Sequence, residues 1–110
     1  MRIKGSFWIE KDGKSFLGKG RVELLKKIHR HGSISKAAKE MKMSYKAAWD
    51  AVDIMNKLSG KKIVEKVSGG KGGGGSRLTK YGIKIIKKYE SIEKEFYNAL
   101  KEMESDFNSL

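Results

Sequence analysis

The sequence predicts a mainly α-helical fold with small β elements: an N-terminal β-hairpin, three helices, a second hairpin and a long C-terminal helix. Three patterns indicate this fold class. Two amphipathic helical segments are separated by Lys42-Met43 alone, which leaves room only for a tight turn. Six glycines, two serines and Lys71 make up residues 68–76 between two short apolar segments, as expected for a long hairpin loop. Apolar residues then recur at heptad spacing from residue 78 to residue 103.

Charge is distributed unevenly along the 110 residues, whose net charge is +12. Residues 1–88 hold 23 cations and 7 carboxylates, a net +16, whereas residues 89–110 hold 2 cations and 6 carboxylates, a net −4. A basic body with an acidic tail favours a polyanionic partner for the body. The alternative explanation is a Lys-rich proteome in which most proteins are basic, since 21 of the 25 cations are Lys.

Composition and length exclude several classes of protein. Cysteine is absent, which excludes disulfides, thiolate zinc sites and thiol nucleophiles. The apolar runs are too short to span a membrane, and residues 1–4 lack the apolar stretch of a signal peptide, so a cytoplasmic protein is expected. The length fits one small domain with an appended helix and leaves no room for a separate catalytic domain.

Residues 3–17 predict the first hairpin, because Asp12-Gly13 is a pair favoured where both turn residues need a positive φ. Apolar residues precede the turn at positions 3 and 7–9 and follow it at positions 16 and 17, although the first strand alternates poorly between apolar and polar. A two-residue loop sets the expected register, which pairs Ile9 with Phe16 and Trp8 with Leu17.

Helical spacing of apolar residues predicts a first helix over residues 21–31, which ends at Gly32. The hydroxyls of Ser35 and Ser44 are expected to cap the second and third helices, because a Ser side chain accepts from a free backbone N–H of the first turn. The second helix is short, and a tight turn joins it to the third, over residues 44–59. This arrangement is a helix-turn-helix, in which residues 44–59 are the recognition helix.

Residues 63–78 predict a wing, meaning two short antiparallel strands joined by the glycine-rich loop. The first strand covers residues 63–67, and Arg77 and Leu78 pair back with it. Residues 1–79 therefore form the predicted winged helix-turn-helix domain, and residues 80–110 form a separate C-terminal helix.

The C-terminal helix is expected to be a dimerisation helix with Thr79 as its cap. Its apolar face is too wide for a lone helix, and the body is too small to cover all of it. Homodimerisation through this helix is therefore expected. The residues predicted at the dimer interface are Ile85, Tyr89, Ile92, Phe96, Ala99 and Met103.

The start of the recognition helix is expected to face the major groove of DNA, because a helix of this width fits there. Its capping Ser and free backbone N–H groups can hold a phosphate, and Lys46 can reach a phosphate or a guanine edge. Asp50 either accepts from a cytosine amino group or orients Lys46. Trp49 either stacks on the sugar–phosphate edge or covers the core. The residues predicted to bind DNA are Ser35, Ser44, Tyr45, Lys46, Trp49, Asp50, Lys71 and Arg77.

No enzyme, cofactor or metal site is expected. The glycine tract lacks the Gly-Lys-Ser/Thr of a nucleotide-binding loop, since Gly72 follows Lys71 and a strand follows the tract. His29 and His31 diverge on a helix and have no third ligand nearby. No Ser/His/Asp set or carboxylate pair indicates catalysis. Asp53 and Lys57 are expected to form an ordinary surface ion pair.

Two strings, GSISKAA over residues 32–38 and MSYKAAWDA over residues 43–51, resemble the N-terminal domain of the ModE molybdate-dependent transcriptional regulators. The resemblance covers roughly residues 16–90. LysR-type regulators share a looser pattern with this sequence. It consists of a Ser followed by Ala-Ala and a second Ser, and further along of Leu-Thr followed by Gly. Further along, the resemblance continues in DIMN (53–56), VEK (64–66), the glycine tract (69–75) and LTKYG (78–82).

The resemblance implies a winged helix-turn-helix that binds an inverted-repeat operator as a dimer, with its last helix at the dimer interface. It implies control of genes for molybdate or tungstate transport or for the molybdenum cofactor. Family members carry molybdate in C-terminal domains. This chain, which ends at Leu110, is expected to be a DNA-binding unit without those domains and not to bind molybdate or tungstate itself.

Two other functions stay open at this point. One is an architectural protein whose basic body coats DNA without reading its sequence. The other is an adaptor whose long helix pairs with a different chain that holds the sensor.

Overall fold

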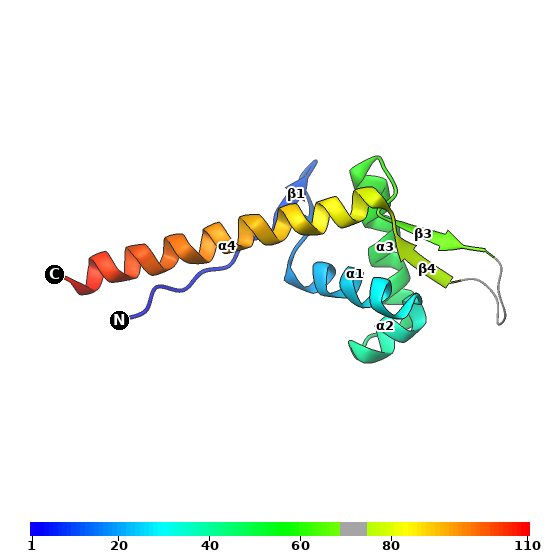
Figure 1. The fold of residues 1–110 in the computed structure, drawn as a ribbon, viewed down its shortest axis with the longest axis horizontal. Coiled ribbons are helices and arrows are strands. Elements are labelled where there is room, and N and C mark those ends of the chain that lie inside the picture. Colours follow the sequence, from blue (N-terminus) through cyan, green and yellow to red (C-terminus); the bar gives the residue numbers. More distant parts are fainter. Residues whose placement is uncertain (69–74) are drawn as a thin grey trace.

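The computed structural model describes residues 1–68 and 75–110. It measures 63 × 28 × 22 Å, because a long C-terminal helix extends from a head of shorter elements (Figure 1). The mainly helical fold class with two small hairpins is confirmed. The elements in order are β1 (Ile9–Lys11), β2 (Lys14–Leu17), α1 (Lys19–His31), α2 (Ile34–Glu40), α3 (Tyr45–Ser59), β3 (Val64–Val67), β4 (Gly75–Leu78) and α4 (Lys80–Asn108).

The core of the head lies where α1, α2 and α3 meet β2 and the start of the wing. Small residues on α2 and α3, including Ala37 and Ala48 at 0% exposure, let these two helices approach closely. Each large side chain taken out of water there stabilises the fold by about 1.5–3 kcal/mol. The largest fully buried side chains are Leu17, Leu24, Leu25, Ile28, Met55 and Ile63.

The structure corrects the predicted cap of α2. Ser33, and not Ser35, caps this helix, and its hydroxyl accepts from the Lys36 N–H at 3.1 Å. The reason is that Gly32 takes a left-handed conformation with φ 66°, which ends α1 and returns the chain to extended backbone at Ser33. Ser35 lies in the first turn of α2 and is exposed. The cap predicted at Ser44 is confirmed, with its hydroxyl 3.0 Å from the Ala47 N–H.

The first hairpin has the predicted turn but a different register. Asp12 and Gly13 have φ values of 53° and 74°, as the two-residue turn requires. Ile9 pairs with Leu17 and not with Phe16, because the register shifts between Ile9 and Glu10. This irregularity lets the consecutive residues Phe16 and Leu17 both turn toward the core, where they are 7% and 1% exposed. Residues 1–8 are not part of a strand.

The wing strands pair as predicted, with Val64 opposite Leu78 and Val67 opposite Gly75. The wing is also bonded to the head, because the Ser76 N–H donates to the Gly32 carbonyl at 2.9 Å. Gly75 has to be glycine here, since a Cβ would lie 2.5 Å from that carbonyl oxygen. Lys71, predicted to bind DNA from the loop between the strands, lies outside the described residues.

Helix α4 spans 29 residues, about 43 Å at 1.5 Å per residue, and Thr79 caps it as predicted. The N-terminal segment, residues 1–8, runs beside its C-terminal half (Figure 1). The Phe7 ring lies 5.2 Å from the Tyr89 ring and 5.1 Å from the Phe96 ring. Nearer the end of the helix, the Ile3 N–H donates to Glu104 at 2.9 Å.

Among residues 1–68 and 75–110, no helix combines the length and the apolar character needed to cross a membrane.

Candidate nucleic-acid interface

The start of α3 is an exposed surface that faces the wing. Tyr45 is 55% exposed and Trp49 is 43% exposed, and the Lys46 side chain is 85% exposed. A hollow of about 550 Å³ lies between the starts of α2 and α3 and the two wing strands. Ser35, Tyr45, Trp49 and Lys66 all line this hollow. The structure therefore brings part of α2, the recognition helix and the wing onto one surface.

Trp49 forms a ridge within this surface. A second hollow, of about 450 Å³, lies on the side of Trp49 toward Asn56 and Lys62. A residue that lines two hollows and is 43% exposed is not a core residue. Its ring is available to a ligand that enters from the side of the wing.

The predicted link between Asp50 and Lys46 is present in the structure. Lys46 Nζ donates to Asp50 Oδ2 at 2.8 Å, across one turn of α3. This hydrogen bond and the charge of Asp50 raise the pKa of the Lys46 ammonium. In the protein alone Asp50 therefore orients Lys46. One turn further on, the expected surface ion pair is confirmed, because Lys57 Nζ lies 2.9 Å from Asp53 Oδ2.

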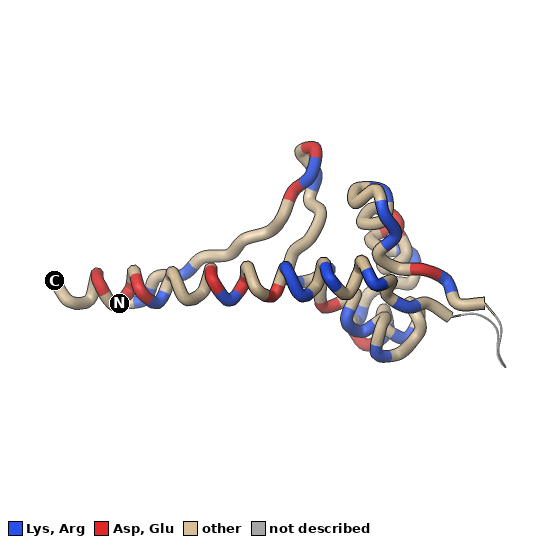
Figure 2. The backbone as a smooth tube through the Cα atoms, turned by 45° about the horizontal axis from the view of Figure 1, so that its top comes forward, with Lys and Arg blue, Asp and Glu red and all other residues tan. Residues whose placement is uncertain are grey.

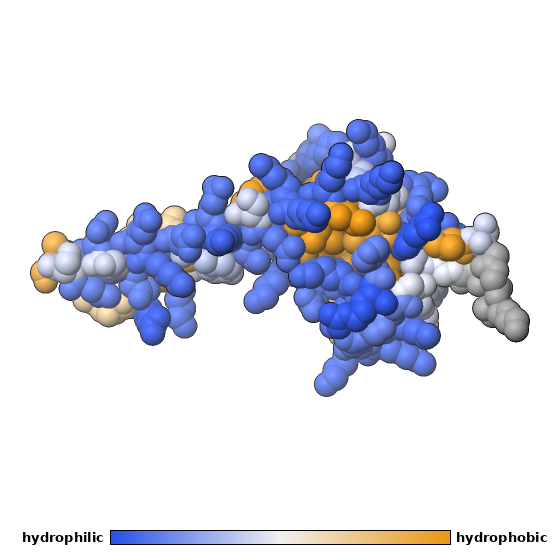
Figure 3. All heavy atoms as spheres, viewed as in Figure 1, coloured by the Kyte–Doolittle hydropathy of each residue, from blue (hydrophilic) through white to orange (hydrophobic). Residues whose placement is uncertain are grey.

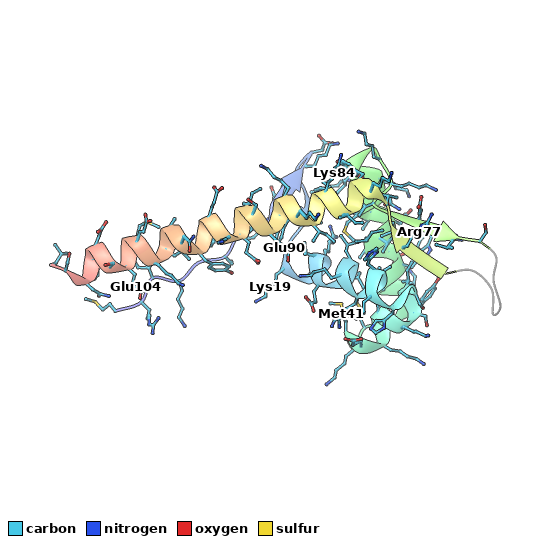
Figure 4. The ribbon with its side chains drawn as sticks, viewed as in Figure 1. Lys19, Met41, Arg77, Lys84, Glu90 and Glu104 are labelled. Atoms are coloured by element: carbon cyan, nitrogen blue, oxygen red, sulfur yellow. The ribbon has the colours of Figure 1, made fainter. Side chains whose placement is uncertain are left out.

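Arg77 lies on β4, at the base of the wing (Figure 4). Its Nε donates to Glu65 Oε1 at 3.0 Å across the strand pair, and its side chain is 61% exposed. This exposed pair holds the guanidinium on the wing without burying it. Lys66, on the neighbouring strand, is exposed and lines the hollow beside Trp49. Sequence reasoning missed Lys66, although its position in a short strand before the glycine tract was a usable signal.

Charge separates along the molecule (Figure 2). Lys and Arg outnumber Asp and Glu in the head and in the first half of α4, whereas Asp and Glu outnumber Lys in the second half of α4. Within the head, Glu40 at the end of α2 is bonded to Lys27 at 2.8 Å and to His31. Lys27 first, and then His31, lower the pKa of the Glu40 carboxyl.

No group of three or more metal-ligating side chains occurs among the described residues.

The predicted dimer face of α4 is divided by the chain itself. Tyr89 is only 2% exposed, because Phe7 of the same chain covers it, and this burial raises the pKa of its hydroxyl. Ile85 and Phe96 are half-buried. Ile92 and Met103 are 37% and 49% exposed, and Ala99 between them is exposed as well. We call Ile85, Ile92, Ala99 and Met103 the outer stripe.

A second apolar area lies between α4 and α1 on the head (Figure 3). It is a hollow of about 300 Å³ whose floor includes Ile83 and Ile86. Lys26 Nζ of α1 lies 2.7 Å from Glu90 Oε2 of α4 at its edge. These contacts attach α4 to α1.

Comparison with known proteins places these features in a family. The family model described as bacterial regulatory helix-turn-helix protein, lysR family, matches residues 20–83, which is more than half of the chain. That range runs from α1 through the wing to the first turn of α4. It includes the whole of the surface around Tyr45, Trp49 and Lys66.

Several curated proteins are similar to the chain. The molybdenum transport protein ModE of Azotobacter vinelandii is 42% identical over 93% of this chain and 38% of its own length. The DNA-binding transcriptional dual regulator ModE of Escherichia coli K12 is 49% identical over 72% of this chain and 30% of its own length. The molybdenum-pterin-binding protein MopB of Rhodobacter capsulatus is 47% identical over 84% of this chain and 34% of its own length.

The chain thus spans about a third of the length of the curated relatives that it matches. The family model matches the helix-turn-helix region, and the family is one of regulators and not an enzyme class. The chain belongs to the bacterial regulatory helix-turn-helix proteins of the LysR family, and within it resembles the N-terminal domain of the ModE-type regulators.

Proposed function

We propose that the chain is a homodimeric, sequence-specific transcriptional regulator that binds an inverted repeat of duplex DNA in the cytoplasm. The observation that supports this most directly is the exposed start of α3, with Tyr45, Lys46 and Trp49 beside a basic wing. An α-helix fits the major groove, and two copies related by a two-fold axis read two half-sites about one helical turn, or a multiple of it, apart.

In this proposal the start of α3 enters the major groove. One sugar–phosphate strand then lies in the hollow of about 550 Å³ between α3 and the wing strands. Ser44 and the first backbone N–H groups of α3 face a phosphate, and Lys66 and Arg77 face the flanking backbone. Lys46 reaches a base edge once DNA draws it away from Asp50. The carboxylate of Asp50 is then free to accept from a cytosine amino group.

Two substitutions separate the two kinds of contact. Arg77→Ala should weaken binding to all sequences alike and flatten the dependence of the binding constant on salt, because a phosphate contact carries no sequence information. Lys46→Ala should change the ranking of sequences by about 1–3 kcal/mol at one position of each half-site. Binding measured for a panel of single-base operator variants at several salt concentrations distinguishes them. If the two variants have the same profile, this assignment of roles is wrong.

The dimer is proposed to form through the outer stripe of α4 in the antiparallel sense. Lys84 and Lys88 lie beside the stripe in the basic half of α4, and Glu95, Glu102 and Asp106 continue the same row into the acidic half. Figure 2 shows the two halves coloured by charge, and Figure 4 labels Lys84 in the first and Glu104 in the second. An antiparallel pair sets each basic half against an acidic half, whereas a parallel pair opposes like charges.

Charge reversal tests this arrangement. The double variant Lys84→Glu/Lys88→Glu should weaken the dimer about tenfold or more, because four exposed cross-chain pairs each contribute up to about 1 kcal/mol. Adding Glu102→Lys and Asp106→Lys to the same chain should restore it. Sedimentation at a series of concentrations and salt levels measures the dissociation constant. Unchanged dimerisation in the double variant, or no rescue in the quadruple one, contradicts the antiparallel pairing.

We extend the proposal to the regulated genes, which would serve molybdate or tungstate transport or the molybdenum cofactor. The support is the set of relatives whose names refer to ModE and to molybdenum. Selection of bound duplexes from a genomic fragment library, with and without molybdate, tests this step. Recovery of an inverted repeat next to such genes supports it. Recovery of random fragments favours architectural binding, and dimerisation only with a second protein favours an adaptor.

A further inference from the structure

One side chain at the far end of the recognition helix is bonded to the wing through its whole amide. Asn56 Oδ1 accepts from the Ile63 N–H at 2.7 Å and from the Val64 N–H at 3.2 Å. Its Nδ2 donates to the Val64 carbonyl at 3.2 Å. The Asn56 amide therefore satisfies three backbone groups at the start of β3, in the way that a neighbouring strand would.

The opposite side of the Ile63 peptide is held by the start of α4. The Thr79 N–H donates to the Ile63 carbonyl at 2.9 Å, and the Thr79 hydroxyl donates to the Lys62 carbonyl at 2.6 Å. Gly82, in the first turn of α4, lies so close that a Cβ on it would be 2.4 Å from the Ile63 oxygen. The recognition helix and α4 therefore meet at two consecutive peptide units, Lys62–Ile63 and Ile63–Val64, whose N–H groups face Asn56 and whose carbonyls face Thr79.

We propose that Asn56 is a positioning residue that fixes the orientation of the recognition helix relative to α4, and thereby sets the spacing of the two half-sites. The inference rests on the proposed function, in which α4 pairs two copies. In such a dimer the separation of the two recognition helices depends on the angle between α3 and α4 in each copy.

The geometry makes this angle consequential. Tyr45, at the other end of α3, lies eleven residues from Asn56, about 16 Å along the helix axis. A rotation of about 10° at Asn56 therefore moves the start of α3 by about 3 Å, close to the 3.4 Å rise of one base pair. Three hydrogen bonds on one planar amide restrict such a rotation more than apolar packing does, since they are directional. Lys61, just after α3, also lies over the Tyr81 ring of α4, with its Nζ 5.2 Å from the ring centroid, and such a contact is less directional than a hydrogen bond.

The experiment measures affinity for a series of inverted repeats whose half-site separation changes in steps of one base pair, and for an isolated half-site. Asn56→Leu has similar volume and removes all three hydrogen bonds. Asn56→Asp keeps the acceptor for the two N–H groups. Ser59→Ala is the matched control, because the Ser59 hydroxyl bonds only within the end of α3 and to the Lys61 carbonyl.

The unaltered chain should bind one separation about tenfold more tightly than its neighbours, a difference of about 1.4 kcal/mol. Asn56→Leu should reduce that preference to about threefold or less while its affinity for an isolated half-site stays within about twofold. Ser59→Ala should keep the original optimum and preference. Asn56→Asp should keep the optimum with a reduced preference, because its second carboxylate oxygen faces the Val64 carbonyl in place of the donating Nδ2. If Asn56 had only a structural role, Asn56→Leu would lower the affinity for every repeat and for the isolated half-site by the same factor.

The outcomes separate this inference from the function on which it rests. If the unaltered chain shows no preferred separation, the proposed dimeric operator binding is wrong. If it does and Asn56→Leu keeps the same optimum and the same preference, the role of Asn56 is wrong. A loss of affinity for the isolated half-site by the same factor as for the repeats also shows that the proposed role of Asn56 is wrong. If Asn56→Leu does not fold, as judged by its melting curve, Asn56→Ser decides the question, because the shorter side chain cannot reach β3.

Discussion

Replacing Gly82 by Ala tests whether α4 begins as close to the wing as the structure has it. An added Cβ would lie 2.4 Å from the Ile63 carbonyl oxygen and 3.1 Å from Ile63 Cγ2. Because the oxygen belongs to buried backbone, α4 has to move by several tenths of an ångström or more. That displacement stretches the hydrogen bond from the Thr79 N–H to the same oxygen, now 2.9 Å long.

The expected effect is the sum of three contributions. Overpacking at a filled site destabilises by about 1–3 kcal/mol. Weakening one buried hydrogen bond adds about 1 kcal/mol. Ala is favoured over Gly inside a helix by about 1 kcal/mol, which opposes the other two. Gly82→Ala should therefore lower the free energy of unfolding by about 1–3 kcal/mol.

Gly20→Ala is the matched control, since Gly20 is also a helical glycine near the start of its helix. A Cβ at Gly20 meets nothing within 4 Å, so this substitution should stabilise by about 0.5–1 kcal/mol. Urea unfolding followed by circular dichroism measures both variants, at one fixed protein concentration because a dimer's stability depends on concentration. A Gly82→Ala protein as stable as the Gly20→Ala protein would refute the close approach.

Two further predictions concern contacts that sequence patterns did not indicate. Phe7→Ala should lower the free energy of unfolding by about 1–3 kcal/mol, because burial and two aromatic pairs are lost, and it should expose Tyr89. Amide hydrogen exchange in the second half of α4 should become faster, and unchanged exchange would contradict the prediction. Glu40 contributes stability above its unfolded-state pKa, because Lys27 and His31 lower its folded pKa, and this contribution is lost as pH falls through the folded value. The difference in unfolding midpoint between the unaltered protein and Glu40→Gln should therefore shrink on acidification below the ordinary Glu range, and a difference that grows there would contradict the sign.

Local signals predicted the elements whose cause is local. The turn at Asp12-Gly13 needs two positive φ values, which that pair supplies at low cost, and the cap at Ser44 needs only a hydroxyl before a helix. The cap of α2 was misplaced because Ser33 and Ser35 carry the same hydroxyl. What decides between them is the left-handed Gly32, which fixes where the chain becomes extended.

Features set by contacts between distant segments could not be predicted in the same way. The shift in hairpin register follows from the need to bury Phe16 and Leu17 together, and that need exists only once the head is assembled. The role of Asn56 depends on a backbone that arrives seven residues later with unpaired N–H groups. An Asn at a half-buried helical position gives no sign of this from sequence alone.

The same limit applies to the long helix, and there it changes the functional argument. Heptad spacing shows which side chains share a face, but it does not show what covers that face. Phe7 lies against Tyr89 and Phe96, so the segment before the first strand covers two of the six residues that were predicted to meet a second copy. Of those six, only the outer stripe, which includes Ile92 and Met103, remains open to a second copy, and it is narrower than a full coiled-coil seam. A dimer built on so narrow a stripe gains less from apolar burial, so the opposed charges beside the stripe have to contribute a larger share of its stability and all of its direction.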